Sequence, residues 1–164
     1  METNKFKKNN KIPDLVDCEI IKLLQKDGRI PNTDIAKKMG ISEGTVRTRL
    51  NRLIKNETIQ IVAVSNPIKL GFKIVGQIRM HIDIGKKEDI VKKLKEIKAL
   101  WFVVQTTGAT TGIEAEFIVK SLADFNTLIF EQISKIEGVI KIDTSLILDF
   151  IKRRYDWGTA LDGE

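Results

Sequence analysis

Apolar residues recur at helical spacing in three short groups within the first third of the chain. Asp14 is a suitable N-cap for the first group and Ser42 for the third, and Gly28 and Gly40 are suited to end the first two. The spacing therefore predicts three helices, over about residues 14–28, 32–40 and 42–55. Their expected buried positions are Val16, Ile20, Leu23, Leu24, Ile35, Ala36, Met39, Val46, Leu50 and Leu53.

The pattern changes after the third helix. Residues 59–64 (IQIVAV) are mostly β-branched, which is typical of a strand, and Asn66-Pro67 interrupts that run. Residues 58–70 are therefore assigned as a linker strand that separates a helical domain, residues 14–57, from a second domain, residues 71–151.

The second domain is expected to alternate strands and helices. Residues 72–84 alternate in polarity, with Ile78 and Met80 on one side and Gln77, Arg79 and His81 on the other. Helices are expected over 88–100 and 124–136, and further strands over 101–106, 113–120 and 139–151. This β-α-β-β-α-β order is that of a ferredoxin-like fold, so the fold class is α+β. One sheet face would carry no helix, and Ile, Val and Met exposed there favour a homo-oligomer.

Composition narrows the class of protein. A chain of 164 residues that is 42% hydrophobic suits one domain or two small ones and argues against a wholly disordered chain. No run approaches the roughly 20 apolar residues of a membrane span, and the polar N-terminus has no apolar signal-peptide core. The single cysteine, Cys18, cannot form an internal disulfide, which fits a reducing cytoplasmic location.

The excess positive charge is concentrated near the N-terminus. Residues 1–60 hold 13 Lys+Arg against 8 Asp+Glu, whereas residues 61–164 hold 15 against 14. Residues 1–13 are interpreted as a mobile arm with lysines at positions 5, 7, 8 and 11. Nucleic acid is the commonest acidic partner of such a region, although a solubilising basic surface explains the charge equally well.

The second and third helices have the spacing of a helix-turn-helix. Ala36 is small where two helices would cross closely, Gly40 lies in the turn, and Val46 would pin the third helix to the second. Such a motif presents the polar face of its second helix to the DNA major groove. Double-stranded DNA is therefore the expected partner.

Roles in DNA binding follow from the position of each residue on its helix. Base edges are assigned to the start of the third helix and to its outer face, where Arg can pair with guanine and Asn with adenine. Phosphates are assigned to the later cations and to the start of the second helix. The alternative is that these residues form a solvated helix face. The expected base contacts are Glu43, Gly44, Thr45, Arg47, Thr48 and Asn51, and the expected phosphate contacts are Asn32, Thr33, Arg52 and Lys55.

These features together resemble the leucine-responsive regulatory protein/AsnC (Lrp/AsnC) family of transcription regulators. The resemblance runs from about Leu15 to Phe150 and rests on three motifs: D-x-x-I-x-x-x-L-Q-x-D-G-R from Asp17, S-x-x-T-V-x-x-R-x-x-x-L from Ser42, and N-P-x-x-L-G from Asn66. It implies a winged-type helix-turn-helix joined to a ferredoxin-like (RAM/ACT-like) domain for sensing and assembly. It also implies a homodimer that forms tetramers or octamers, and an amino acid as a candidate effector.

Two departures from the family pattern affect these implications. The family pattern E-x-G-x-I reads Lys55-Asn56-Glu57-Thr58-Ile59 here, and Asn56 is expected to supply the left-handed residue. The family pattern T-G-x-Y-D in the turn between the second and third strands of the sensing domain lacks its Tyr-Asp pair here. Candidate effector contacts are Thr107, Gly108 and Ala109 in that turn, with Glu114 and Asp143 as substitute acids; a purely structural turn is the alternative.

Other functional classes have weaker support in the sequence. An architectural DNA-binding protein of low sequence specificity would share the same basic features. No zinc-type cluster, Ser-His-Asp set or phosphate loop is recognisable, so neither an enzyme nor a metal or cofactor is expected. Glu114 and Glu116 share one strand face and could hold a metal, but a solvated face is the simpler interpretation. Siroheme decarboxylases resemble these regulators in fold, and the resemblance implies histidine chemistry, for which this chain has only His81.

The tail, residues 152–164, is not explained by the domain pattern. Its aromatic residues, Tyr155 and Trp157, suggest that it docks on a neighbouring subunit.

Overall fold

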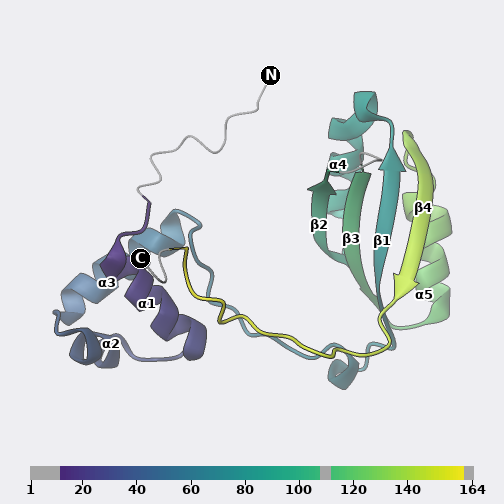
Figure 1. The fold of residues 1–164 in the computed structure, drawn as a ribbon. Coiled ribbons are helices and arrows are strands. Elements are labelled where there is room, and N and C mark those ends of the chain that lie inside the picture. The colour runs from purple at the N-terminus through teal and green to yellow at the C-terminus, as the bar shows by residue number, and fades with distance from the viewer. Residues whose placement is uncertain (1–11, 108–111, 161–164) are drawn as a thin grey trace. The chain divides into compact units, whose positions relative to one another are not determined.

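The computed structural model describes residues 12–107 and 112–160, which form two compact units (Figure 1). One unit holds the described residues up to Ala63 together with those from Lys152 onward. The other spans Val64–Ile151. The lysines assigned to the basic arm lie outside the described residues, as do Gly108 and Ala109.

The first unit contains the three predicted helices, which are confirmed: α1 (Leu15–Lys26), α2 (Asn32–Met39) and α3 (Glu43–Lys55). Asp14 caps α1 in a capping box with Asp17, because each side chain accepts the other's backbone N–H. Gly40 ends α2 with φ +66°, the left-handed conformation expected for a glycine in this turn. The core of the unit consists of Ile20, Ile35, Ala36 and Val46.

The end of α3 corrects one prediction. Asn56 has φ −86°, so it does not take the left-handed conformation, whereas Glu57 does, with φ +57°. Thr58 N–H donates to Leu53 O at 2.9 Å and Glu57 N–H donates to Ile54 O at 3.0 Å. This is the hydrogen-bond pattern of a Schellman motif, in which glycine usually occupies the left-handed position.

The predicted linker strand is wrong as a strand. Within residues 58–70 the structure has only a short 3-10 helix, η1 (Ile68–Leu70), and residues 59–64 have no regular structure. Ile61, Val62 and Val64 are exposed. A strand requires a neighbouring backbone to satisfy its N–H and C=O groups, and no other segment of the described chain pairs with residues 59–64.

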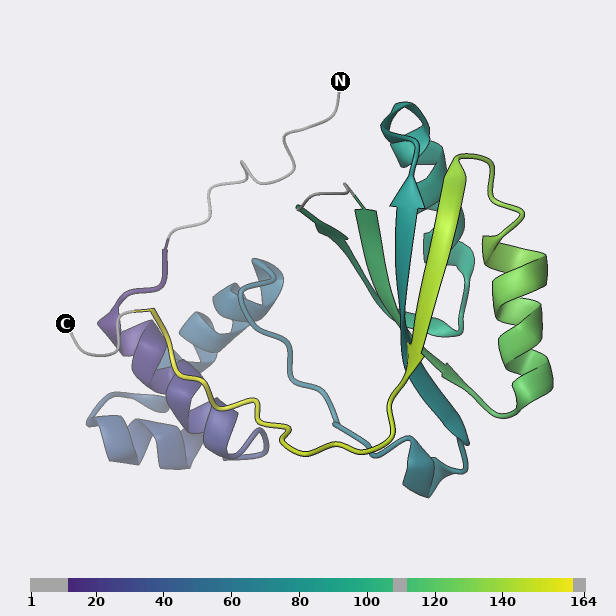
Figure 2. The same cartoon turned by 45° about the vertical axis from the view of Figure 1, so that its right-hand side comes forward.

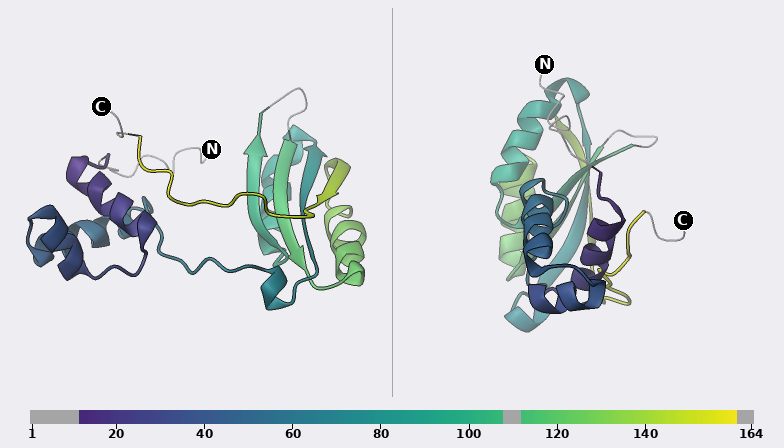
Figure 3. Two further views of the ribbon diagram at one scale, coloured as in Figure 1. Left: turned by 60° about the horizontal axis from the view of Figure 1, so that its bottom comes forward. Right: turned by 90° about the vertical axis from the view of Figure 1, so that its left-hand side faces the viewer.

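The second unit is a four-stranded antiparallel sheet with the order β2-β3-β1-β4, which confirms the ferredoxin-like topology. Its strands are β1 (Ile74–Ile82), β2 (Leu100–Thr106), β3 (Gly112–Val119) and β4 (Val139–Leu146). A short helix η2 (Ile84–Lys86) and α4 (Lys87–Glu96) follow β1, and α5 (Leu122–Asn126) continues as a π-helix, η3 (Thr127–Ile133), after β3. Figures 2 and 3 show that these helices cover one face of the sheet.

Several predicted boundaries in this unit differ from the structure. The helix expected to reach residue 100 ends at Glu96, because Ile97 adopts an extended conformation. The helix expected over 124–136 begins at Leu122 and ends as a π-helix at Ile133. The last strand ends at Leu146 rather than at residue 151.

The two sheet faces differ in composition from what was expected. Ile78 and Met80 pack in the core beneath the helices, with Phe117 of β3. A Cβ at Gly76 would lie 2.6 Å from the Phe117 ring and 2.4 Å from Ser145 O, so only glycine allows this packing. On the uncovered face, Arg79 of β1 lies between Glu114 of β3 and Asp143 of β4, and we call these three residues the charged ladder. The exposed Phe102 of β2 lies on the same face. Among the described residues, this face carries no methionine.

None of the helices in the described ranges is both long and apolar enough to span a bilayer.

Candidate nucleic-acid interface

The predicted recognition helix, α3, buries one side and exposes another. Val46 and Leu53 are buried against the unit's core, and Leu50 is half-buried. Every residue assigned to a base edge is exposed, and so is one of those assigned to phosphates. These exposed assigned residues are Glu43, Gly44, Thr45, Arg47, Thr48, Asn51 and Lys55.

The start of α3 is rigidly capped. Ser42 Oγ accepts the Thr45 backbone N–H at 3.1 Å, and the Ser42 and Thr45 hydroxyls lie 2.8 Å apart. The Thr45 hydroxyl is thus engaged with the cap. A Cβ at Gly44 would meet only Ser42 Oγ, at 3.8 Å, so the backbone here is open to close approach by a ligand.

The start of α2 lacks a side-chain cap. Its N-cap is Pro31, which makes no side-chain hydrogen bond to the helix. Thr33 is exposed and Asn32 is half-buried at this end. A helix N-terminus without a side-chain cap presents backbone N–H groups that suit a phosphate oxygen.

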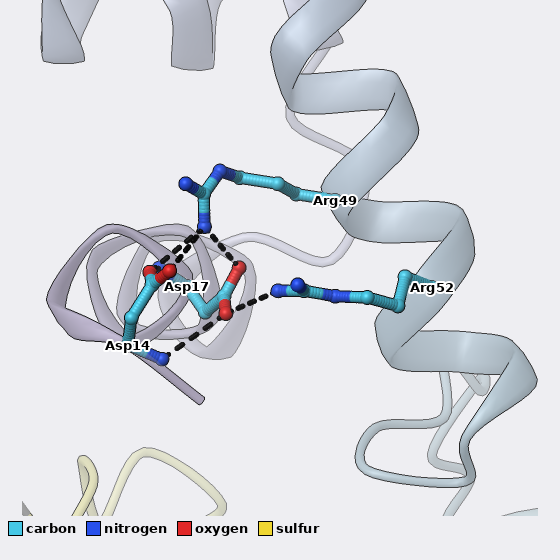
Figure 4. Close-up of polar contacts among 4 residues, drawn as sticks. All are labelled: Asp14, Asp17, Arg49 and Arg52. Atoms are coloured by element: carbon cyan, nitrogen blue, oxygen red, sulfur yellow. Dashed lines mark hydrogen bonds and ion pairs between the residues drawn. The ribbon is translucent and has the colours of Figure 1, made fainter. Parts of the chain in front are cut away.

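Four charged residues join α1 to α3 (Figure 4). The Arg49 guanidinium donates through Nη1 to both carboxylate oxygens of Asp14 at 2.8 Å and to Asp17 Oδ1 at 2.9 Å. Arg52 Nη2 donates to Asp17 Oδ2. Asp17 has no solvent exposure, whereas the arginine side chains are 26% and 34% exposed. We call these residues the acid–arginine clamp.

The clamp lowers the pKa of Asp14, the more exposed of its two acids. The hydrogen bond from Arg49 lowers the pKa of Asp14 to about 2, with a further contribution from the Asp17 backbone N–H. Reciprocally, the hydrogen bonds to Asp14 and Asp17 raise the pKa of Arg49. Both groups are therefore ionised at neutral pH.

The sequence analysis did not predict this clamp, which engages two of the four cations of α3 with acids at the start of α1. Asp17 and Arg49 both occur in the quoted motifs, and Asp14-Asp17 and Arg49-Arg52 each have the i, i+3 spacing that places two side chains on one helix face. That pairing was the available signal. Arg52, assigned to phosphates, directs one guanidinium nitrogen to a buried acid instead. Arg47 and Lys55 are the exposed cations of α3, whereas Arg49 and Arg52 are half-buried.

The candidate effector acids lie together on the uncovered face of the sheet. The strand register places Glu114 of β3 and Asp143 of β4 on either side of Arg79 of β1. Arg79 Nε donates to Glu114 Oε1 at 3.0 Å, and Lys141 Nζ lies 2.9 Å from Asp143 Oδ1. The hydrogen bond from Lys141 lowers the pKa of Asp143. Each acid already has a cation, so a ligand ammonium would have to compete with Arg79 or Lys141.

Of the remaining residues of chemical interest, His81 and Glu116 lie on the same sheet face as these acids. Thr107 is exposed directly after β2. His81 Nε2 lies 3.6 Å from Asp143 Oδ2, and Glu116 Oε1 lies 3.5 Å from Gln77 Nε2. Cys18 is buried in α1. Across residues 12–107 and 112–160, no group of three or more His, Cys, Asp or Glu is arranged to hold a metal.

Comparison with known proteins assigns each unit a class. Residues 13–60 match the winged helix-turn-helix DNA-binding family, and residues 77–157 match the Lrp/AsnC ligand-binding domain. The fold and the matched domains thus define a helix-turn-helix regulator with a ligand-binding domain. The chain belongs to the Lrp/AsnC family of transcriptional regulators.

Relatives of the chain cover nearly its full length. An uncharacterised HTH-type transcriptional regulator of Pyrococcus furiosus is 34% identical over 90% of this chain and 97% of its own. The HTH-type transcriptional regulator LrpA of Pyrococcus horikoshii is 35% identical over 83% and 96%. The structure of Escherichia coli AsnC superposes with a TM-score of 0.75 at 19% identity, over 87% of this chain and 97% of AsnC.

A further similar structure is that of a regulator bound to an amino acid. It is a transcriptional regulator of Neisseria meningitidis in complex with L-Met, with a TM-score of 0.76 at 20% identity over 88% of this chain and 96% of the other. At this identity the likeness concerns the fold.

Proposed function

We propose that this Lrp/AsnC-type regulator binds specific double-stranded DNA through the exposed face of α3. The observation that carries the proposal is the arrangement of Arg47, Thr48 and Asn51, which lie exposed together on a helix whose opposite side is buried. Arginine and asparagine side chains can each make bidentate contacts with a base edge in the major groove. The capped N-terminal turn, with Glu43, Gly44 and Thr45, enters the groove first.

Phosphate contacts in this proposal flank the base contacts. Lys55 at the end of α3 supplies a cation, and the uncapped start of α2 supplies backbone N–H groups with Asn32 and Thr33. Arg52 contributes mainly by orienting α3 through Asp17. A cytoplasmic location is part of this proposal, and the DNA-binding family and the single cysteine, Cys18, support it.

The second unit is proposed to assemble copies of the chain and to bind a small effector. Its uncovered sheet face carries Phe102, 44% exposed, beside the charged ladder, and a second copy would cover it. An amino acid is the proposed effector class, as in the L-Met complex of the Neisseria relative. Thr107 with Glu114 and Asp143 would contact it, as would Gly108 and Ala109, which lie outside the described residues.

A salt series separates this function from its rivals. The purified protein is titrated with the DNA upstream of its own gene and with a scrambled fragment of equal length. A ratio of affinities above about 10³ supports a sequence-specific regulator. Equal and steeply salt-dependent binding to both fragments supports an architectural protein. Absence of binding to either would contradict both DNA-binding functions and direct attention to an enzyme built around His81.

A further inference from the structure

The C-terminal segment belongs to the DNA-binding unit, although it follows the last strand of the sheet. β4 ends at Leu146, and the chain from Lys152 onward groups with the helices of the first unit. Figure 2 shows this segment, in yellow, reaching α1. The sequence suggested docking of the tail on a neighbouring subunit. In the structure it meets a helix of its own chain.

The contact is a paired hydrogen bond between one side chain and one backbone unit. Gln25 Nε2 donates to Gly158 O at 3.0 Å, and Gly158 N–H donates to Gln25 Oε1 at 3.0 Å. Both bonds are partly buried and join residues 133 positions apart. A primary amide has one donor group and one acceptor group side by side, so Gln25 satisfies both polar groups of this glycine.

The segment has local features that present Gly158 to Gln25. Gly158 has φ +81°, a conformation that residues with a Cβ rarely adopt. The Tyr155 and Trp157 rings lie 6.3 Å apart, and the Arg153 guanidinium lies 5.5 Å from the Tyr155 ring centre. Arg154 Nη2 pairs with Asp156 at 2.7 Å. These contacts all lie within the five residues just before the docked glycine.

We propose that the Gln25 amide on α1 is a docking site for the C-terminal segment of the same chain, with Gly158 as the docked residue. The helices of the DNA-binding unit are then connected to the sheet domain twice. One connection is the chain after α3, and the other is the tail, which continues from β4 and is hydrogen-bonded to α1. Only residues 147–151 separate β4 from the segment held by α1. A change at the end of β4 would thus reach α1 along the chain without passing through the linker.

Hydrogen exchange at the Gly158 amide tests the contact in the full-length protein. Gln25→Ala removes both bonds and keeps a strong helix former in α1. Gly158 exchange, measured by NMR, should become about tenfold faster than in the wild type, as expected for the loss of two hydrogen bonds of ordinary net strength. Gln60→Ala, the same change elsewhere in the unit, should leave the rate unchanged. An unchanged rate in Gln25→Ala would overturn the proposal.

A second variant tests which part of the amide matters. Gln25→Glu keeps an acceptor for the Gly158 N–H but replaces the donor to the Gly158 carbonyl. Its exchange rate should fall between those of the wild type and Gln25→Ala. A rate equal to that of the wild type would show that the donor bond from Gln25 Nε2 to Gly158 O contributes nothing to docking, and would contradict the paired geometry.

Mixed assemblies determine whether the docking is within one chain. Isotope-labelled Gln25→Ala is co-refolded with unlabelled Gly158→Pro, which cannot donate at position 158 or adopt φ +81°. The labelled chain then has an intact tail, and only its partner has Gln25. Same-chain docking predicts fast Gly158 exchange in the labelled chain. Recovery of slow exchange would assign the tail to the partner's α1 and overturn the same-chain proposal.

Discussion

Asp17 is completely buried, and its Oδ1 accepts a hydrogen bond from Arg49 Nη1 at 2.9 Å. This contact joins the first turn of α1 to the middle of α3, so the orientation of α3 depends on a buried acid that is not among the residues proposed to contact DNA. Arg52 occupies the other oxygen of the same carboxylate. The buried acid is therefore fully compensated, which is the condition under which a buried charge is tolerated.

Removing the buried acid should destabilise the helical unit. Asp17→Ala leaves Arg49 and Arg52 without their shared partner and removes one hydrogen bond of the capping box. We expect the free energy of unfolding to fall by about 3 kcal/mol, as for breaking one side of a buried ion pair. Calorimetry of the full chain measures this loss. Asp34→Ala, at an exposed position of α2, is the control; an equal loss in both variants would remove the special role of Asp17.

The depressed pKa of Asp14 predicts a dependence on acid. Its pKa is about 2 in the folded chain, against 3.8 for the ordinary group, because Arg49 donates to it. Its stabilising contribution is thus fully present above about pH 4 and is lost as the pH falls toward 2. An NMR titration of the Asp14 carboxyl carbon should give a midpoint near 2 in the wild type.

The matched variants for that titration are two arginine-to-glutamine changes. Arg49→Gln removes the cation and should return the Asp14 midpoint toward 3.8. Arg47→Gln lies on the exposed side of α3, away from the clamp, and should leave the midpoint near 2. If both variants gave the same midpoint, Arg49 would not be the cause of the shift.

Glu57 predicts a stabilising substitution. Its left-handed φ of +57° is strained for a residue with a Cβ and costs about 1–2 kcal/mol. Glycine relieves this strain, but it also raises the conformational entropy of the unfolded chain, which offsets part of the gain. Glu57→Gly should therefore raise the free energy of unfolding by about 0.5–1 kcal/mol in urea titrations.

Gly40 provides the opposite case at the end of α2. A Cβ there would meet no atom within 4 Å, so Gly40→Ala introduces only backbone strain at φ +66°. The expected loss is about 1 kcal/mol. Should Glu57→Gly destabilise the protein as Gly40→Ala does, strain would not be the relevant property of residue 57.

Two cations on α3 should differ in what they contribute to DNA binding. Arg47→Ala is expected to cost about 1–3 kcal/mol on the specific site and to relax preference at one base pair. Lys55→Ala is expected to weaken binding to all sequences and to lower the slope of log K against log salt by about one. Competition assays over a salt series measure both, and a uniform effect of Arg47→Ala would contradict its role at a base edge.

The sequence predicted local elements and side-chain alternation well, because these depend on neighbours in the chain. The face of β1 that carries Ile78 and the left-handed glycine at position 40 are examples. It did not predict contacts that depend on how helices cross, such as that between Asp17 and Arg49. Residues 59–64 look like a strand by composition alone, yet a strand forms only where another backbone pairs with it.

The candidate site shows the same division. The exposed outer face of α3 follows directly from its periodicity, and so does the buried position of Val46. The commitment of Arg52 to a buried acid does not, because a free cation and a paired one look identical in a list of residues. The same holds for Glu114 and Asp143, whose cationic neighbours come from the strand register.

The absence of a side chain at Gly76 gives β1 a socket that the Phe117 ring fills. A larger residue at 76 collides with the ring, and a smaller one at 117 leaves a void in the core. A smaller residue at 117 would still not make room at 76, because the backbone oxygen of Ser145 lies 2.4 Å from a Cβ there. Divergent sequences that keep this fold should therefore retain glycine at position 76, even where the residue at 117 has changed.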